Sequence, residues 1–150
     1  MRPENEDDLS AAIREARGPL AIRGSGTAGL VGSGEMLETG GLRGISLYEP
    51  GALTVVAGAG TPLAEVEAAL AQEGQRLAFE PMDYRAMLGT SGAPTLGGLV
   101  AQNRAGPRRV QAGACRDFLL GVRFVDGAGQ IVKNGGRVMK NVTGYDLVKL

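Results

Sequence analysis

Three stretches of the chain carry apolar residues at the three- and four-residue spacing typical of an amphipathic helix. The first covers residues 5–17, and Asn5 is a suitable N-cap for it. The second is expected to begin with Thr61 as its cap and Pro62 at the first helical position. A third, shorter helix is predicted after Thr95. The residues expected to face inward are Leu9, Ala12, Ile13, Ala16, Leu63, Val66, Ala69, Leu70, Leu96, Leu99 and Val100.

Short apolar runs, several of them rich in β-branched residues, predict the strands. No helical pattern fits between Gly29 and Gly44, because glycine recurs too often there. The run from Asp126 to Gly129 predicts a hairpin turn. Strands are expected at residues 20–22, 45–48, 53–57, 77–79, 118–125 and 130–133, a loop at 80–94, an extended segment at 138–142, and an apolar helix from Thr143.

The bulk composition narrows the class of protein. The 150 residues are 43% hydrophobic, which suits one domain with a real core. Basic and acidic residues balance at 16 each, so no nucleic-acid partner is expected. There is no run of about 18 apolar residues to cross a membrane. The acidic N-terminus is unlike a signal peptide, and the single Cys115 favours a reducing compartment, so we expect a cytoplasmic protein.

Two counts are unusual. The sequence has 25 glycines and no histidine. Many backbone positions must therefore adopt positive φ or approach another group closely. The lack of histidine removes the commonest general base, the commonest metal ligand and any histidyl cofactor link, and no Cys/His metal set is present.

A glycine-rich stretch at residues 24–29 matches the Gly-x-Gly-x-x-Gly dinucleotide pattern and follows a predicted strand. A Rossmann reading fails, because the third glycine should lie in a helix that this sequence cannot form. The loop can still bind phosphate through its N–H groups, helped by Arg23 and the hydroxyls of Ser25 and Thr27. A plain glycine-rich surface turn is an equally good interpretation of this stretch alone.

A second candidate anion site begins at Thr95, where Gly97 and Gly98 would expose the N–H groups of a helix start. The alternative is a short core helix that only packs. No Lys-Ser/Thr pair follows, which excludes a Walker A loop. Two separate glycine-rich anion sites together suit a diphosphate that is gripped from two sides.

Other polar residues are weaker candidates. Arg108 and Arg109 can neutralise phosphate, although a solvated pair is the simpler interpretation. Cys115 beside an arginine can have a lowered pKa, but a small buried filler is favoured. A polar cluster of Lys140, Tyr145 and Asp146 either contacts an aromatic cofactor or fixes a helix start.

These motifs resemble a known family. Residues 19–27 are similar to the first FAD-pyrophosphate loop of the vanillyl-alcohol-oxidase-type flavoproteins, the PCMH-type FAD-binding domain. Residues 95–109 are similar to the second, and residues 113–121 and 135–147 to elements that follow. The resemblance implies an α+β, two-subdomain PCMH-type FAD-binding fold, C-terminally incomplete, with subdomains at about 1–85 and 86–150 and no cap domain.

The resemblance also implies the binding residues and the cofactor. FAD would be noncovalent, since no histidine is present to tether it. The first loop and the second segment would hold the pyrophosphate, and Gly113 and Val132 would lie near the adenine half. The residues implied to bind FAD are Arg23, Gly24, Ser25, Gly26, Thr27, Thr95, Gly97, Gly98, Ala101, Asn103, Gly113 and Val132.

Details of the motifs, above all Gly-Pro-Arg-Arg at residues 106–109, look closest to the FAD-binding subunits of bacterial glycolate oxidases. That likeness implies an oxidoreductase complex that oxidises a 2-hydroxy acid, with glycolate going to glyoxylate. Its partners would be a homologous flavin subunit and an iron–sulfur subunit, which can place it peripherally at the inner membrane. The alternative is a non-catalytic FAD-binding or scaffolding subunit. The sequence alone identifies no catalytic residue.

Overall fold

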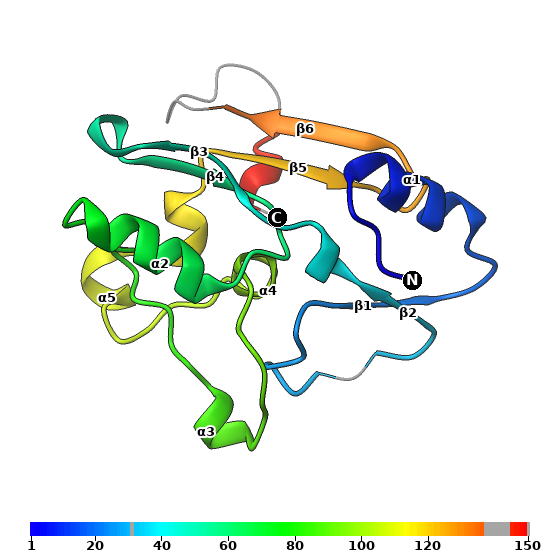
Figure 1. The fold of residues 1–150 in the computed structure, drawn as a ribbon, viewed down its shortest axis with the longest axis horizontal. Coiled ribbons are helices and arrows are strands. Elements are labelled where there is room, and N and C mark those ends of the chain that lie inside the picture. Colours follow the sequence, from blue (N-terminus) through cyan, green and yellow to red (C-terminus); the bar gives the residue numbers. More distant parts are fainter. Residues whose placement is uncertain (31, 137–144, 150) are drawn as a thin grey trace.

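The computed structural model describes residues 1–30, 32–136 and 145–149. Its β-structure consists of paired strands. Within those residues the strands form two-stranded sheets and no larger one (Figure 1). One pair is parallel and the other two are antiparallel hairpins. The strands are β1 (Leu20–Arg23) with β2 (Glu35–Glu38), β3 (Ile45–Glu49) with β4 (Thr54–Ala57), and β5 (Gly121–Val125) with β6 (Ile131–Gly135). The predicted α+β class is confirmed.

Helix α1 (Glu6–Glu15) begins where the sequence predicts, because the Asn5 side chain accepts a hydrogen bond from the Asp8 N–H at 2.8 Å. It ends earlier than predicted, since Ala16 is already extended. The helix packs on β5, and the buried Ser10 hydroxyl donates to the Gly129 carbonyl at 2.6 Å. The N-terminal helix therefore rests on a hairpin from the other end of the chain.

Strands β1 and β2 pair in parallel, and fewer of the β1 side chains are buried than the sequence predicts. The predicted strand at 20–22 exists, but only Ala21 is buried and Ile22 is 70% exposed. Strand β2 is not predicted by the sequence, because its Glu-Met-Leu-Glu pattern places a single side chain, Leu37, in the core. Its other edge accepts the N-terminus, where the Glu38 N–H donates to the Met1 carbonyl.

The β3–β4 hairpin leads into α2 (Leu63–Gln72), which buries Val66 and Leu70 as predicted. The predicted cap is wrong. Pro62 stands at the N-cap without a side-chain bond, and the buried Thr61 hydroxyl accepts instead from the Gly44 N–H at 2.9 Å. Thr61 thus ties the hairpin to the helix rather than closing the helix end.

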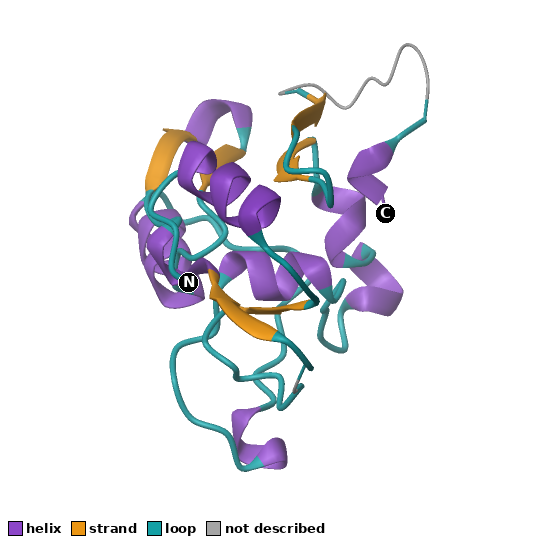
Figure 2. Cartoon of the chain, turned by 90° about the vertical axis from the view of Figure 1, so that its right-hand side faces the viewer, coloured by secondary structure: helices purple, strands orange, loops and turns teal. Residues whose placement is uncertain are grey.

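The core is centred on Phe79, Leu99 and Cys115. The strand predicted at 77–79 is wrong, because these residues form a turn that places Phe79 in the core, 5.4 Å from the ring of Phe118. The strand predicted from Phe118 starts only at Gly121, since Cys115–Phe118 form a short 3-10 helix. Helix α3 (Arg85–Leu88) interrupts the loop predicted at 80–94 and projects from the body (Figures 1 and 2).

Helix α4 (Leu96–Ala101) follows, and then α5 (Arg109–Ala112). Main-chain bonds join the segments before and after α4 to earlier parts of the chain: the Leu63 N–H donates to the Pro94 carbonyl and the Gly106 N–H to the Phe79 carbonyl. The division into subdomains near residue 85 stays a prediction.

The C-terminal part differs from expectation. The hairpin turn at 126–129 is confirmed, with the Asp126 carboxylate accepting from the Ala128 and Gln130 N–H groups. The described end of the chain holds a 3-10 helix, Leu147–Lys149, in place of the predicted apolar α-helix. The extended segment predicted at 138–142 lies outside the described residues.

Candidate anion-binding site between two loops

The two glycine-rich segments, far apart in the sequence, meet in the structure. The first loop (residues 23–28) leaves β1, and the second loop (residues 90–98) enters α4. A Cβ atom added at Gly24 would lie 2.6 Å from the Thr95 hydroxyl, so only glycine fits at that contact. The structure therefore brings the predicted halves of a diphosphate site into direct contact.

The first loop presents polar groups that have no partner among the described residues. Gly26 has φ 76°, and the Arg23 guanidinium folds over it. Within the described part of the chain, the N–H groups of Ser25, Gly26, Thr27 and Ala28 donate no hydrogen bond. The Ser25 hydroxyl is buried and likewise has no hydrogen-bond partner in the described ranges. A buried hydroxyl normally finds a partner, so Ser25 and the N–H donors beside it suit an anion with several oxygens.

The second loop differs where it enters α4, because the N–H groups of Leu96, Gly97 and Gly98 are already used. Thr95 caps α4 as predicted and accepts from the Gly98 N–H at 3.3 Å. The Leu96 N–H donates to the Thr61 carbonyl, and the Gly97 N–H donates to the Ala59 carbonyl at 2.8 Å.

Gly97 is explained by packing. A Cβ atom there would lie 2.6 Å from the Cβ of Ala59. The interpretation of this stretch as a helix that packs on the core accounts for Gly97 without a ligand. Its role in holding FAD stays a prediction.

The remaining predicted binding residues are spread over the elements that follow. Ala101 is exposed at the end of α4. Asn103 adopts φ 47°, and its amide oxygen accepts from the Arg116 N–H at 2.9 Å. Gly113, with φ 104°, ends α5, and Val132 lies on β6 opposite Phe124. Their part in binding stays a prediction.

Among the weaker candidates, Arg108 and Cys115 have structural roles. Arg108 pairs with Glu80 at 2.6 Å. Burial raises the pKa of Cys115 to about 11, so it is a protonated core thiol and not a nucleophile. Asp146 accepts from the Val148 N–H, Tyr145 is 90% exposed, and Lys140 lies outside the described residues.

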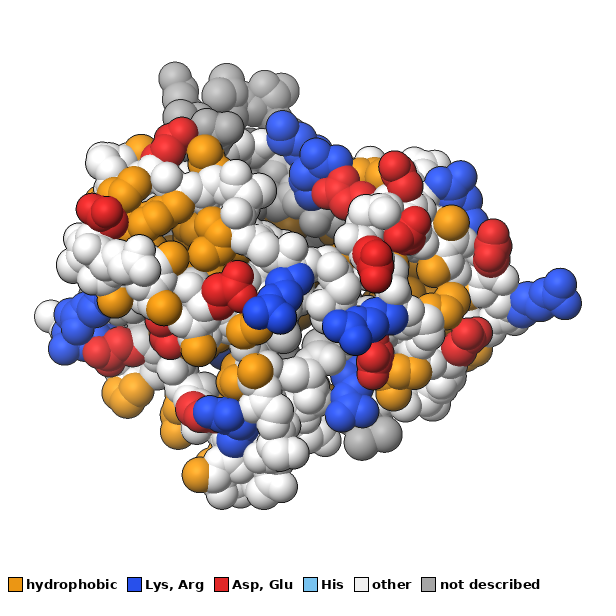
Figure 3. All heavy atoms as spheres, in the orientation of Figure 1, with side chains coloured by type: hydrophobic (Ala, Val, Ile, Leu, Met, Phe, Trp, Pro, Cys, Tyr) orange, Lys and Arg blue, Asp and Glu red, His pale blue; other side chains and the backbone are white. Residues whose placement is uncertain are grey.

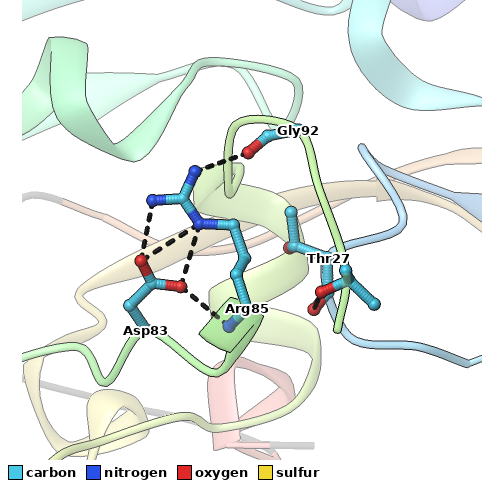
Figure 4. Close-up of polar contacts among 5 residues, drawn as sticks. Thr27, Asp83, Arg85 and Gly92 are labelled. Atoms are coloured by element: carbon cyan, nitrogen blue, oxygen red, sulfur yellow. Dashed lines mark hydrogen bonds and ion pairs between the residues drawn. The ribbon is translucent and has the colours of Figure 1, made fainter. Parts of the chain in front are cut away.

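A group of residues beside the first loop was not predicted from the sequence (Figure 4). Thr90 donates its hydroxyl to the Thr27 carbonyl at 2.9 Å, and Arg85 donates to the Gly92 carbonyl at 2.7 Å. Hydrogen bonds from Arg85 lower the pKa of the Asp83 carboxyl to about 2. The Asp-x-Arg spacing at residues 83–85 is the signal that the sequence offers, within a stretch that it otherwise predicts as a loop.

Other kinds of site are not found in the described ranges. They contain no group of His, Cys, Asp or Glu side chains that could hold a metal ion. None of the helices described is long and apolar enough to cross a membrane. Acidic and basic side chains are interspersed on the face shown in Figure 3, in keeping with the net charge of zero.

Comparison with known proteins gives a consistent result. Residues 1–135 match the family described as FAD binding domain. The chain is 45% identical to glycolate oxidase subunit GlcE of Escherichia coli strain K12 over 147 residues, which is 96% of this chain and 40% of that protein. It is 32% identical to glycolate oxidase subunit GlcD of Bacillus subtilis, covering 100% of this chain and 32% of that one.

More distant proteins show the same fold. A D-lactate dehydrogenase of Archaeoglobus fulgidus is 31% identical over 100% of this chain and 34% of its own length. The solved structure of 6-hydroxy-D-nicotine oxidase from Arthrobacter nicotinovorans superposes with a TM-score of 0.71 at 15% identity, covering 89% of this chain and 29% of that one. The chain thus spans well under half the length of the relatives it matches.

Proposed function

The chain belongs to the FAD binding domain family, and on that premise we propose that it is the cofactor-binding part of a 2-hydroxy-acid oxidoreductase. The substrate we propose is glycolate, which would be oxidised to glyoxylate. The relatives named as glycolate oxidase subunits and as a D-lactate dehydrogenase support this proposal, because glycolate and lactate are both 2-hydroxy acids.

The first loop carries the proposal. The unpartnered Ser25 hydroxyl and the free N–H groups beside it fit the oxygens of the FAD diphosphate. Gly24 lets this loop lie directly on Thr95, which keeps the site compact. We propose that Arg23, Gly24, Ser25, Gly26 and Thr27 hold the diphosphate.

The second side of the cofactor would meet α4 and the segments after it. The residues that we propose for this side are Thr95, Gly97, Gly98, Ala101, Asn103, Gly113 and Val132. Gly97 and Gly98 would act through the close approach of their backbone, since their N–H groups are already bonded.

When bound, FAD supplies the redox chemistry by accepting a hydride equivalent from the carbon that carries the substrate hydroxyl. The residues of this chain bind and orient the cofactor. The sequence has no histidine, so FAD is held without a histidyl bond. We assign no proton-transfer residue to this chain.

We further propose that the chain works in a complex with a homologous flavin subunit and an iron–sulfur subunit. The subunit names of the E. coli and B. subtilis relatives support an assembly of several subunits. Association with such partners would bring the chain to the inner face of the membrane.

The test is the visible spectrum of the purified protein, alone and with its partners. A bound flavin whose absorbance bleaches when glycolate is added to the assembled complex is the expected result. A colourless protein that still assembles with its partners would instead support the alternative function, a non-catalytic scaffolding subunit.

The position of the site is tested separately by Gly98→Glu. A carboxylate at this position would meet the diphosphate with bulk and negative charge, so flavin retention should be lost. A Cβ atom at Gly98 comes near only the Thr95 hydroxyl, at 3.2 Å, so Gly98→Ala is a suitable control. A folded Gly98→Glu protein with unchanged FAD affinity would refute the placement.

A further inference from the structure

We propose that Arg85 and Thr90 are positioning residues for the cofactor, holding the first loop in the conformation in which its free N–H groups face the diphosphate. The inference rests on the proposed function, because it concerns the same loop. Arg85 is the first residue of α3 and Thr90 follows that helix; Thr90 bonds the first loop directly, and Arg85 bonds Gly92 beside it (Figure 4).

Thr90 fixes the orientation of one peptide group. Its hydroxyl donates to the Thr27 carbonyl at 2.9 Å. In a trans peptide the carbonyl and the following N–H point in opposite directions. Holding the Thr27 carbonyl toward Thr90 therefore turns the Ala28 N–H the other way, and that N–H has no partner among the described residues. Without the bond, the peptide could rotate and present its carbonyl to the phosphate.

Arg85 holds the segment that carries Thr90. Its guanidinium donates to the Gly92 carbonyl at 2.7 Å and is itself held by the Asp83 carboxylate. Its own carbonyl accepts from the Thr90 N–H. Gly92 in turn lies on the first loop, since a Cβ atom there would be 3.3 Å from the Ser25 carbonyl oxygen. The chain of contacts thus runs from Asp83 through Arg85 to the loop.

Helix α3 contributes no buried side chain to the core. Its Met87, for example, is 66% exposed. The segment also meets Gly29, the residue after the first loop, whose added Cβ would contact the side chains of Leu88 and Thr90. Removing the polar contacts should therefore loosen the loop and leave the fold intact.

The first experiment compares Thr90→Val with Thr90→Ser by measuring FAD binding to the purified protein through flavin fluorescence. Valine keeps the shape but removes the donor, so the FAD dissociation constant should rise about fivefold, the equivalent of one ordinary hydrogen bond. Serine keeps the hydroxyl and should restore the affinity of the wild type. The midpoint of thermal unfolding of the cofactor-free protein should be the same for all three.

The second experiment separates geometry from charge at Arg85. Arg85→Ala and Arg85→Lys should both weaken FAD binding by about tenfold, because lysine keeps the charge but cannot make the bidentate contact with Asp83. Arg43→Ala is the matched control, since Arg43 makes a similar exposed pair with Glu65, at 2.8 Å. Riboflavin, which lacks the diphosphate, should bind the wild type and every variant alike.

The outcomes are distinguishable. A wild-type protein that binds no FAD would refute the proposed function. Wild-type binding with unchanged affinity in Thr90→Val and Arg85→Ala would refute only the positioning role. Lower affinity for riboflavin as well, or a lower unfolding midpoint, would show a merely structural role, and an Arg85→Lys protein that binds like the wild type would show that charge alone acts at Arg85.

Discussion

At the scale of single residues, Gly97 and Gly98 are neighbours that meet different surroundings. A Cβ atom at Gly97 would lie 2.6 Å from Ala59, whereas at Gly98 it would come near only the Thr95 hydroxyl, at 3.2 Å. We predict that Gly97→Ala lowers the free energy of unfolding by about 1–3 kcal/mol through overpacking. Gly98→Ala should change it much less. Urea unfolding of both variants measures the difference, and equal losses would contradict this account.

A second residue-scale prediction concerns Cys115, whose pKa is raised to about 11 by burial. An acid with a raised pKa stays protonated in the folded protein after it ionises in the unfolded chain. Stability should therefore fall as the pH rises from about 9 towards 11, and a thiol reagent at pH 8 should label the folded protein slowly. Cys115→Ala removes this ionisation and is the control. Rapid labelling of the native protein would overturn the prediction.

At the scale of elements, helix α1 is the one whose start the sequence predicts best. The Asn5 cap bonds the Asp8 N–H at 2.8 Å. We predict that Asn5→Ala destabilises the protein by about 1 kcal/mol. Asn5→Asp should retain most of the stability, because its carboxylate can accept the same bond. Thermal unfolding of the two variants tests this, and identical losses would argue against a capping role.

The elements also show which parts of the structure could be predicted. Caps, hairpin turns and helical periodicity are local signals, and they correctly indicated α1, α2, α4 and the β5–β6 turn. Strand β2 was missed because its stability comes from main-chain pairing with β1 on one side and Met1 on the other, with only Leu37 in the core. The apolar run that ends at Phe79 was wrongly predicted as a strand, because the Phe79 side chain reaches the core from a turn.

The candidate site was predictable only in part. The glycine pattern located both loops, because positions with positive φ or a close backbone contact favour glycine. The Asp-x-Arg spacing indicates the Asp83–Arg85 pair, but the acceptors of Arg85 and Thr90 are the main-chain carbonyls of Gly92 and Thr27, which a side-chain pattern does not reveal. The bonds from the Leu96 and Gly97 N–H groups to the carbonyls of Thr61 and Ala59 were not predictable for the same reason.

At the scale of the whole molecule, the site joins parts of the chain that lie far apart in sequence. The first loop leaves β1, the second enters α4, and main-chain bonds from α4 reach the turn before α2. A ligand held between the loops must therefore stabilise the fold as a unit. At FAD concentrations of about 100 times the dissociation constant, the free energy of unfolding should rise by about 2.7 kcal/mol.

That prediction is measured as a rise in the thermal midpoint with increasing FAD. ADP, which carries the diphosphate without the flavin, should also raise the midpoint if it is the diphosphate that bridges the loops. Riboflavin, which has the flavin without the diphosphate, should raise it least. Since the first loop supplies the free N–H donors, a stabilisation by riboflavin equal to that by FAD would mean that the loops do not hold the phosphates.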